Sequence, residues 1–359
     1  MKSLKNTFIG LFLLLLLGGF VCAAEKASFQ AEISEIDVHG NAYLSIKPSL
    51  LITKGFSASD IVNVQVGTYK FTAPIVRNYS DVDNGEFLLR LEPNAVSLSI
   101  NMGNFAKVTG AEVGTKVTVT LKKSYGYLIE FQTRMLKQND DRTRFASDEI
   151  FANFREVSGG KIAKGKLYRS YSPIRGDNRS PYAAKLVEST KIDLVINLGD
   201  SKESAEPQLK SVPYYKSLSD NGKVLYVNMG SSFSGDEFNA QLKEVLVFIA
   251  EHPDCKYLVH GKDGKNRTGF IAGILLALNG ATLEEITEDY MKSFENLYSV
   301  QKNFQQYDLI SNTVPFMFSN INGGKKVTQK NLHQVVTNYL INTIGLTKAQ
   351  VDALCKNLQ

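Results

Sequence analysis

Hydrophobic and polar residues alternate over the first third of the chain, and helical spacing takes over further along. From about residue 28 to 133, short runs rich in Val, Ile, Thr and Tyr recur, with Gly, Asn, Asp and Pro between them. This pattern predicts strands, and their close spacing favours a small all-β barrel or sandwich. The predicted strands are Ala42–Ile46, Ile61–Thr68, Phe87–Leu91, Val96–Ile100, Thr115–Leu121 and Tyr127–Thr133.

From about residue 150, short apolar runs alternate with helical segments, which predicts an α/β domain with a mostly parallel, doubly wound sheet flanked by helices. Ile192–Leu198, Val224–Asn228 and Tyr257–Val259 suit buried strands, with an irregular, partly acidic stretch between the first two. Thr282 and Glu285 predict a capping box. The predicted helices are Pro181–Thr190, Phe238–Glu251, Thr268–Leu278, Leu283–Phe294, Gln329–Leu340 and Thr347–Leu358.

Residues 1–24 have the parts of an export signal: a basic start, the apolar run Phe8–Leu17 and small residues before Glu25. We expect cleavage after Ala23 or Ala24 and an exported protein, periplasmic or secreted. The alternative is a lipid-anchored envelope protein attached through Cys22, although Val21 fits a lipobox poorly. No transmembrane segment is expected in the mature chain.

The predicted organisation is a signal peptide (1–24), a β-barrel-like domain (25–135), a polar linker (136–149) and an α/β domain with C-terminal helices (150–359). The formal charge of +5 falls to about +3 without the signal's two lysines, which is too mild to suggest nucleic-acid binding. Cys255 and Cys355 permit either one disulfide or two free thiols. No Cys and His spacing suggests a metal site.

The segment His260–Gly269 (HGKDGKNRTG) joins a predicted strand to a predicted helix, and such a junction is an anion site. The helix start offers unpaired N–H groups. The glycines of the segment allow the chain to curl so that successive N–H groups point toward one bound anion. Arg267 can add a bidentate fork to two phosphate oxygens. Lys262 and Lys265 are expected to flank the mouth.

This segment resembles the phosphate-binding loop of cysteine-dependent tyrosine phosphatases, in which His-Cys is followed by five residues, Arg, Ser or Thr, and Gly. Asn153–Val157, Gly165–Pro173 and Ile192–Leu198 are similar to segments of the bacterial dual-specificity-like members. The resemblance implies their fold. It also implies phosphate binding by Gly261, Lys262, Asp263, Gly264, Lys265, Asn266, Arg267 and Thr268, with structural support from His260, Gly269 and Arg169.

Gly261 stands where the family has its nucleophilic cysteine, so no catalytic residue follows from the resemblance. The family's reaction needs a thiolate and a general acid. Asp263 is the only carboxylate in the loop, and we expect it to face solvent or to be salt-bridged. Asp236 and Glu237 come late in the segment where the family has its acid, and a role as first-turn acids favoured by the helix dipole explains them better than catalysis. No cofactor or metal is implied.

The segments around Ile36–Asn41, Ile100–Ala106 and Gly114–Val117 resemble the small β-barrel domain of the S-adenosylmethionine (SAM) hydroxide adenosyltransferases. The adenosine site of that family needs a partner domain that this chain does not contain. The resemblance therefore implies a barrel with a structural or docking role.

Three functions remain open. The favoured one is a phosphate- or phosphoester-binding pseudophosphatase whose partner is a phosphorylated small molecule or a phosphoprotein. The second is an active phosphatase on phosphotyrosine, phosphoinositide or inositol phosphate substrates by a non-cysteine route, with Asp263 or Asp236 as weak candidates. The third is a surface adhesion or assembly protein.

Overall fold

The computed structural model describes residues 27–230 and 233–359. The predicted export signal and Cys22 lie outside these residues, as do Ser231 and Ser232. The chain divides into two compact units, one ending at Leu128 and the other starting at Ile129.

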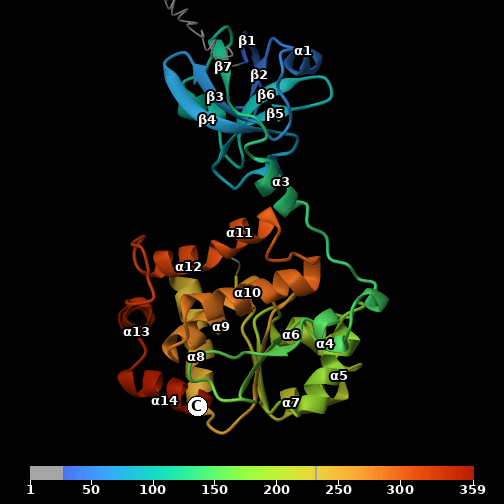
Figure 1. The fold of residues 1–359 in the computed structure, drawn as a ribbon, viewed down its shortest axis with the longest axis vertical. Coiled ribbons are helices and arrows are strands. Elements are labelled where there is room, and N and C mark those ends of the chain that lie inside the picture. The colour runs from blue at the N-terminus through green and yellow to red at the C-terminus, as the bar shows by residue number, and fades with distance from the viewer. Residues whose placement is uncertain (1–26, 231–232) are drawn as a thin grey trace, which may run out of the picture. The chain divides into compact units, whose positions relative to one another are not determined.

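The first unit is a closed seven-stranded barrel with the strand order β1-β2-β6-β5-β4-β3-β7 (Figure 1). All neighbours are antiparallel except β4 and β5, which are parallel. Its strands are β1 (Ser28–Ile36), β2 (Ala42–Leu44), β3 (Ile61–Val66), β4 (Tyr69–Val76), β5 (Phe87–Leu91), β6 (Val96–Ile100) and β7 (Lys116–Lys123). Short helices α1 (Pro48–Thr53), η1 (Tyr79–Asp81) and α2 (Phe105–Thr109) lie between them.

Period-two patterning explains the barrel strands. In β3 the valines Val62, Val64 and Val66 are buried while the residues between them are more exposed, so one strand face fills the interior. The predicted barrel is confirmed, and β5 and β6 have the predicted bounds. The predicted strand list omits β1 and β4, whose charged and polar residues dilute the apolar pattern.

The prediction of a strand at Tyr127–Thr133 is wrong, because this segment forms helix α3 (Leu128–Arg134). β7 already pairs with β1 on one side and with β3 on the other. The barrel is therefore closed at β7, and no open edge remains to which a further strand could add.

The second unit contains a five-stranded sheet with the order β11-β10-β12-β9-β8. β11, β10, β12 and β9 are parallel, and β8 is antiparallel to β9. The bounds are β8 (Arg155–Glu156), β9 (Leu167–Ser170), β10 (Leu194–Asn197), β11 (Val224–Tyr226) and β12 (Tyr257–His260). The predicted α/β fold with a mostly parallel sheet is confirmed.

Helices cover both faces of this sheet (Figure 1). Ile196 and Val259 point into a core shared with α8, α9, α10 and the C-terminal helices, whereas Val195 and Leu258 point into a core shared with α5, α6 and α7. The helices are η2 (Arg142–Arg144), α4 (Asp148–Phe151), α5 (Ser180–Thr190), α6 (Lys202–Leu209), α7 (Pro213–Asp220), α8 (Asp236–Glu251), α9 (Asn266–Leu278), α10 (Leu283–Tyr298), α11 (Gln305–Ser311), α12 (Thr313–Ile321), α13 (Leu332–Asn342) and α14 (Lys348–Leu358).

The stretch between β10 and β11 is not irregular as predicted, because α6 and α7 form there. α6 is capped by Ser201 despite containing Pro207, and α7 begins with Pro213 and buries Tyr215. The capping box of Thr282 and Glu285 at α10 is confirmed. Helices α11 and α12 were not predicted.

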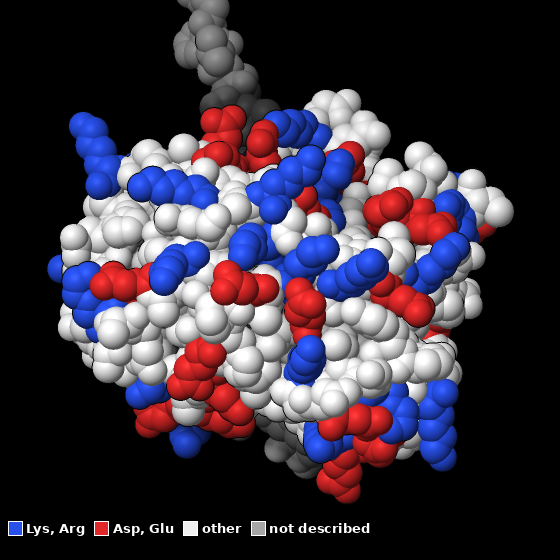
Figure 2. Space-filling model, turned by 90° about the horizontal axis from the view of Figure 1, so that it is seen from below, with Lys and Arg blue, Asp and Glu red and all other residues white. Residues whose placement is uncertain are grey.

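The face shown in Figure 2 is mixed in charge, with Lys and Arg side chains interspersed with Asp and Glu. Across residues 27–230 and 233–359, no helix has the length and apolar character needed to cross a bilayer, and no grouping of His, Cys, Asp and Glu suits a metal ion. Cys255 and Cys355 are free thiols, so no disulfide joins them.

Candidate phosphate-binding site

The loop that leaves β12 curls directly into the start of α9. Residues 261–268, together with Phe233, line a pocket of about 240 Å³. The helix has no side-chain cap at its N-terminus, so its first N–H groups are left for a ligand in the pocket. The loop therefore has the geometry of an anion site.

Two glycines are required by close approach of neighbouring atoms. Gly264 has a φ of +64°, and a Cβ there would lie 2.0 Å from the carbonyl oxygen of Ser170. A Cβ on Gly269 would lie 2.6 Å from the ring of Tyr290. Neither position admits a side chain without moving the loop or the helix behind it.

Two buried side chains hold the back of the loop. Arg169, on β9, is fully buried, and its Nη2 donates to the carbonyl oxygens of Gly264 (2.8 Å) and Lys265 (3.0 Å). Asn153 Nδ2 donates to the carbonyl oxygens of Asp263 (3.1 Å) and Gly264 (3.3 Å). These bonds turn the loop's carbonyl groups away from the pocket, which leaves its N–H groups on the pocket side.

Asp289 on α10 neutralises the buried arginines beneath the loop. Its carboxylate accepts hydrogen bonds from Arg169 and from Arg155 Nε (3.1 Å). Burial alone would raise the pKa of Asp289, but the two guanidinium groups hold it below the ordinary value. Ser293, one turn along α10, adds its hydroxyl to the same network through Arg155 Nη2 (3.0 Å).

His260 ends β12 and is completely buried. Its Nε2 lies 2.9 Å from the hydroxyl of Tyr215, which is also 3.3 Å from Asn197 Nδ2. Burial lowers the pKa of His260 to about 4, so its ring is neutral at physiological pH. A neutral, hydrogen-bonded ring at this position orients the strand end and adds no charge to the pocket.

Comparison with known proteins agrees with this geometry. A sequence model of the tyrosine phosphatase family matches residues 149–359, which is more than half of the chain. This chain belongs to the tyrosine phosphatase family. A second model, of the SAM hydroxide adenosyltransferase C-terminal domain, matches residues 31–118 in the barrel. No curated protein matches the chain.

Solved structures show more distant similarity. The core catalytic domain of a PP-IP phosphatase from S. cerevisiae, in complex with citrate, is 19% identical, with a TM-score of 0.29, and the match covers 49% of this chain and 96% of that one. An uncharacterized conserved protein from Thermotoga maritima is 26% identical, with a TM-score of 0.25, over 26% of this chain. The match spans only 36% of the Thermotoga protein.

The tyrosine phosphatase loop lacks its nucleophile here, but the place for it is preserved. The φ of Gly261 lies outside the left-handed region, and among the described residues a Cβ built there would meet only Thr268 Oγ1 at 3.5 Å and Leu198 Cβ at 4.0 Å. A side chain would therefore fit. Cys255 precedes β12, at the opposite end of the strand from the loop. Burial raises the pKa of its thiol, so it offers no substitute thiolate.

Thr268 faces the position of the missing side chain. Its side chain is 1% exposed, and within the described residues its hydroxyl has no hydrogen-bond partner. Leaving a buried hydroxyl unpaired costs about 1–3 kcal/mol. The loop pocket therefore contains a buried hydroxyl, that of Thr268, which no described protein atom satisfies by a hydrogen bond.

Arg267 extends from the first turn of α9 to the residues that follow strands β10 and β11. Its Nη1 donates to the carbonyl oxygens of Leu198 (2.9 Å) and Met229. In the described part of the chain, both hydrogen bonds use Nη1, so Nε and Nη2 are available to an anion in the pocket. Burial lowers the pKa of Arg267 from its ordinary value, but a guanidinium group remains charged.

The charged side chains at the rim do not all face the pocket. Lys262 is exposed. Lys265 donates to the hydroxyl of Tyr298 (2.8 Å) and lies over that ring at 4.7 Å, so an anion would have to compete with Tyr298 for this ammonium group.

Asp263 forms a salt bridge with Arg175 (2.7 Å) and is therefore not a free carboxylate. Asn266 accepts from Tyr290 (3.1 Å).

The segment between β11 and α8 is where the family has its general acid, and none of its described residues places a carboxylate in the pocket. Phe233 of this segment lines the pocket, and its ring packs against Phe270 of α9 with 5.3 Å between the ring centroids. Asp236 and Glu237 occupy the first turn of α8 and are exposed. Their position explains them as helix-dipole partners. Neither is among the residues that line the loop pocket.

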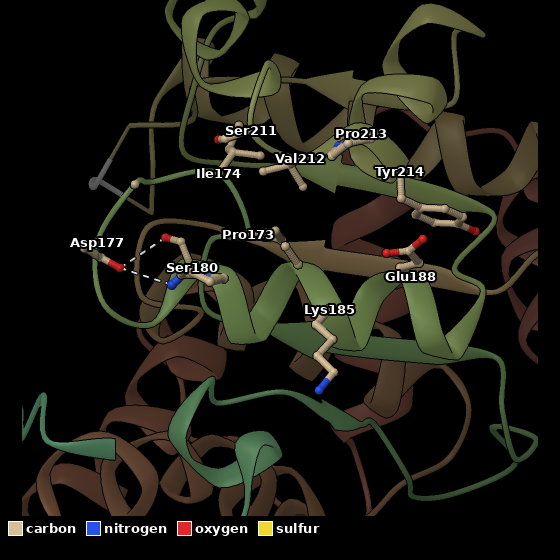
Figure 3. Close-up of a pocket in the computed structure, with 13 residues that line it drawn as sticks. Pro173, Ile174, Asp177, Ser180, Lys185, Glu188, Ser211, Val212, Pro213 and Tyr214 are labelled. Carbon is tan, nitrogen blue, oxygen red and sulfur yellow. Dashed lines mark hydrogen bonds between the residues drawn. The ribbon is translucent and has the colours of Figure 1, made fainter. Parts of the chain in front are cut away.

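A second, larger cavity of about 350 Å³ lies away from the loop (Figure 3). It is formed by α5, the segment around Pro173 and residues 211–214, and Lys185 and Glu188 extend from α5 beside it. At one end Asp177 accepts from the backbone N–H and hydroxyl of Ser180 and thereby fixes the start of α5. Asp177 and Ser180 are occupied by this helix capping, and no arginine is among the described residues that line the cavity, whereas Arg267 lines the loop pocket, so the smaller loop pocket is the better candidate for ligand chemistry.

The support network contains residues that the sequence did not single out. Asp289, Ser293 and Asn296 lie on one face of α10, the second helix after the loop, and Asn296 Nδ2 donates to Asn153 Oδ1 (3.2 Å). Tyr215 lies on α7. The polar residues in the otherwise apolar face of α10 are the one available signal. Their partners could not be inferred without the fold.

Proposed function

We propose that the second unit binds a phosphate or phosphoester group in the pocket of residues 261–268 and does not hydrolyse it, so that this member of the family is a pseudophosphatase. The observation that carries the proposal is Gly261: the loop, its support and Arg267 are in place around a residue that has no nucleophile. The ligand class, a phosphorylated small molecule or phosphoprotein, follows from the family.

Removal of the thiolate favours binding in this geometry. A thiolate at the base of the pocket would repel a phosphate dianion, and two unit charges about 4 Å apart interact by about 4 kcal/mol at an effective dielectric near 20. With Gly261, the helix N-terminus and Arg267 act on the ligand without that opposition. The salt bridge between Asp263 and Arg175 further reduces the negative charge that faces the pocket.

Binding is tested by calorimetric titration of the full chain with inorganic phosphate and phenyl phosphate. We expect saturable binding that Arg267→Ala weakens by about 10- to 100-fold, the usual effect of removing a charged hydrogen-bond partner. Arg142→Ala is the matched control. Arg142, on η2, forms a salt bridge with Asp148, on α4, and does not line the loop pocket. Equal loss in both variants, or no binding by the native chain, would refute the proposal.

Catalysis is tested by phosphate release from an aryl phosphate and from inositol hexakisphosphate. The native chain is expected to be silent, and Gly261→Cys is expected to turn over because a side chain fits beside Thr268. Release by the native chain that depends on Arg267 would establish the alternative, an active phosphatase with another nucleophile. Asp263→Asn would then be the first variant to examine.

We also propose that the chain is exported, because residues 1–24 have the composition of a signal. N-terminal sequencing of the mature chain is expected to begin at Ala24 or Glu25. A chain that begins at Met1 would contradict export, and one that begins at a lipid-modified Cys22 would establish the anchored alternative.

A further inference from the structure

We infer that the outer side of α12, together with the turn that follows it, is a docking surface for an anionic lipid bilayer. Phe316 enters the membrane interface, and Lys325, Lys326 and Lys330 contact the lipid headgroups. This surface lies outside the phosphate loop, so the inference does not depend on the ligand proposed for that loop.

The helix α12 exposes a large aromatic ring on its outer side. Its inner side buries Val314, Met317 and Phe318, and the helix packs against α10, α11 and α13 (Figure 1). The outer side is a stripe of exposed residues spaced four apart: Asn312, Phe316, Asn320 and Gly324. Phe316 is 64% exposed within this stripe, where an amphipathic helix ordinarily carries a polar side chain.

Lysines continue this stripe beyond the end of the helix. The N–H of Gly324 donates to the carbonyl oxygen of Ser319 (2.9 Å), and Lys325 and Lys326 follow at once. Lys330 completes the turn before α13 begins. All three lysines are exposed, and none of the ion pairs formed by the described residues involves them. Their charges are therefore available to a partner.

Acidic residues are missing from this part of the sequence. Between Asp308 and Asp352 the chain has four lysines, one histidine and no aspartate or glutamate. Gln329 accepts from the N–H of Leu283 (2.8 Å), which brings the first-turn acids of α10 to one side of the turn, but Glu285 is engaged in the capping box. The formal net charge of +5 is thus concentrated around α12 and α13.

A bilayer is the partner that fits both the ring and the lysines. One exposed aromatic residue is ordinary by itself, and a soluble polyanion would need only the lysines. A membrane interface takes up an aromatic ring at the boundary of headgroups and acyl chains while anionic headgroups meet the lysines. Each lysine near such a surface adds about fivefold in affinity, so we expect reversible binding that weakens as salt rises.

Co-sedimentation with lipid vesicles tests the surface. The chain from Glu25 onward keeps both units and lacks the apolar run Phe8–Leu17, which would itself bind lipid. We expect it to bind phosphatidylcholine vesicles that contain phosphatidylglycerol and to bind pure phosphatidylcholine at least about tenfold more weakly. The triple variant Lys325→Gln/Lys326→Gln/Lys330→Gln is expected to bind the anionic vesicles about 100-fold more weakly.

Two controls distinguish this surface from other positive charges. Lys202→Gln/Lys210→Gln/Lys223→Gln removes the same charge from exposed positions in and after α6, and should bind within about threefold of the native chain. Equal loss in both triple variants would overturn the inference. Arg267→Ala should also bind vesicles as the native chain does, and loss of binding in this variant would place the headgroup in the phosphate loop and overturn it too.

Fluorescence tests whether the ring enters the bilayer. The chain has no tryptophan, so Phe316→Trp introduces a single reporter, and Met102→Trp in the barrel, at a position 85% exposed, is the matched control. On anionic vesicles we expect the emission of Phe316→Trp to shift to the blue and to be quenched by lipids brominated in their acyl chains, with no change in the control. Vesicle binding without these changes, or binding to heparin and not to vesicles, would overturn the inference.

Discussion

The two sides of the phosphate loop differ in how their polar groups are satisfied. On the back, Arg169 and Asn153 hold the loop carbonyls, and Asp289 neutralises the arginines. On the pocket side, Gly261 has no side chain and Thr268 has a hydroxyl without a protein partner. The shape of the loop is therefore maintained from behind, by residues outside it, and does not depend on the nucleophile.

The largest loss of stability is expected from Asp289→Ala, which removes the carboxylate that neutralises the buried arginines behind the loop. Arg155 and Arg169 would then be buried charges without a counter-ion, and loss of one partner of a buried pair costs about 3–5 kcal/mol. Denaturant unfolding followed by a probe in the second unit measures this loss. Phosphate binding should fall with it, since the loop carbonyls lose their anchor.

The matched control is Glu288→Ala, one residue earlier on the same helix. Glu288 pairs with Lys302 in an exposed salt bridge, and such pairs contribute about 1 kcal/mol or less. If both variants were equally stable, the back of the loop would not depend on Asp289.

A second contribution to stability, dependent on pH, is expected from His260, which lies at the end of β12 just before the loop. Its folded-state pKa of about 4 lies below the ordinary value of 6.5. As pH falls through this window, the unfolded chain binds a proton that the folded chain excludes, so stability decreases and the decrease is complete near pH 4. The difference of about 2.5 pKa units corresponds to about 3 kcal/mol.

The variant His260→Gln isolates this contribution from that of the carboxylates, which also titrate in acid. Free energies of unfolding at pH 7 and pH 4 are expected to differ less in the variant than in the native chain by up to about 3 kcal/mol. Identical pH dependence in the two proteins would show that His260 is protonated in the fold as readily as in the unfolded chain.

A pair of glycine substitutions compares the two sides within one loop. Gly264→Ala strains a left-handed residue and forces Cβ into the Ser170 carbonyl at the back, so we expect a loss of more than about 2 kcal/mol. Gly261→Ala places its Cβ in the open pocket side and should leave stability within about 0.5 kcal/mol. Thermal unfolding measures both variants. Equal melting temperatures would contradict the conclusion that the loop is fixed by contacts on its back and is open on its pocket side.

Much of the fold and of the loop itself could be predicted from the sequence, and the reasons are local. Regular apolar spacing is sufficient for β5, β6 and α8, and the loop's glycines and Arg267 lie within ten residues between a strand and a helix. The salt bridge or solvent exposure predicted for Asp263 depends only on its charge in an anion site. Such features need no knowledge of distant partners.

The remaining features depend on contacts between distant segments. The position of Asp289 among the apolar residues of α10 is a signal in the sequence, but its partner Arg169 lies 120 residues away and could not be inferred from that signal. Lys265 was expected at the mouth but lies against Tyr298, 33 residues away. The strand predicted at Tyr127–Thr133 is a helix because the barrel closes without it, and closure is a property of the whole sheet.

The smallest expected effect is at the pocket rim, where Asp263→Asn removes the one carboxylate of the loop. Asp263 is partly exposed and paired with Arg175, so its repulsion of a bound anion is weakened by solvent and by its partner. Neutralising it also leaves Arg175 without one of its anions. Both changes favour phosphate, and together they should tighten binding by about two- to fivefold.

This gain must depend on salt, because exposed charges are screened beyond about 8–10 Å at physiological ionic strength. Titrations at low and high salt should therefore show the increase for Asp263→Asn shrinking as salt rises. Asp220→Asn is the matched control, since Asp220 forms an exposed salt bridge with Lys216 on α7 and lines no part of the loop pocket. A loss of phosphate affinity in Asp263→Asn would mean instead that this carboxylate orders the front of the loop through Arg175, and the front would then be held by its own contacts as the back is.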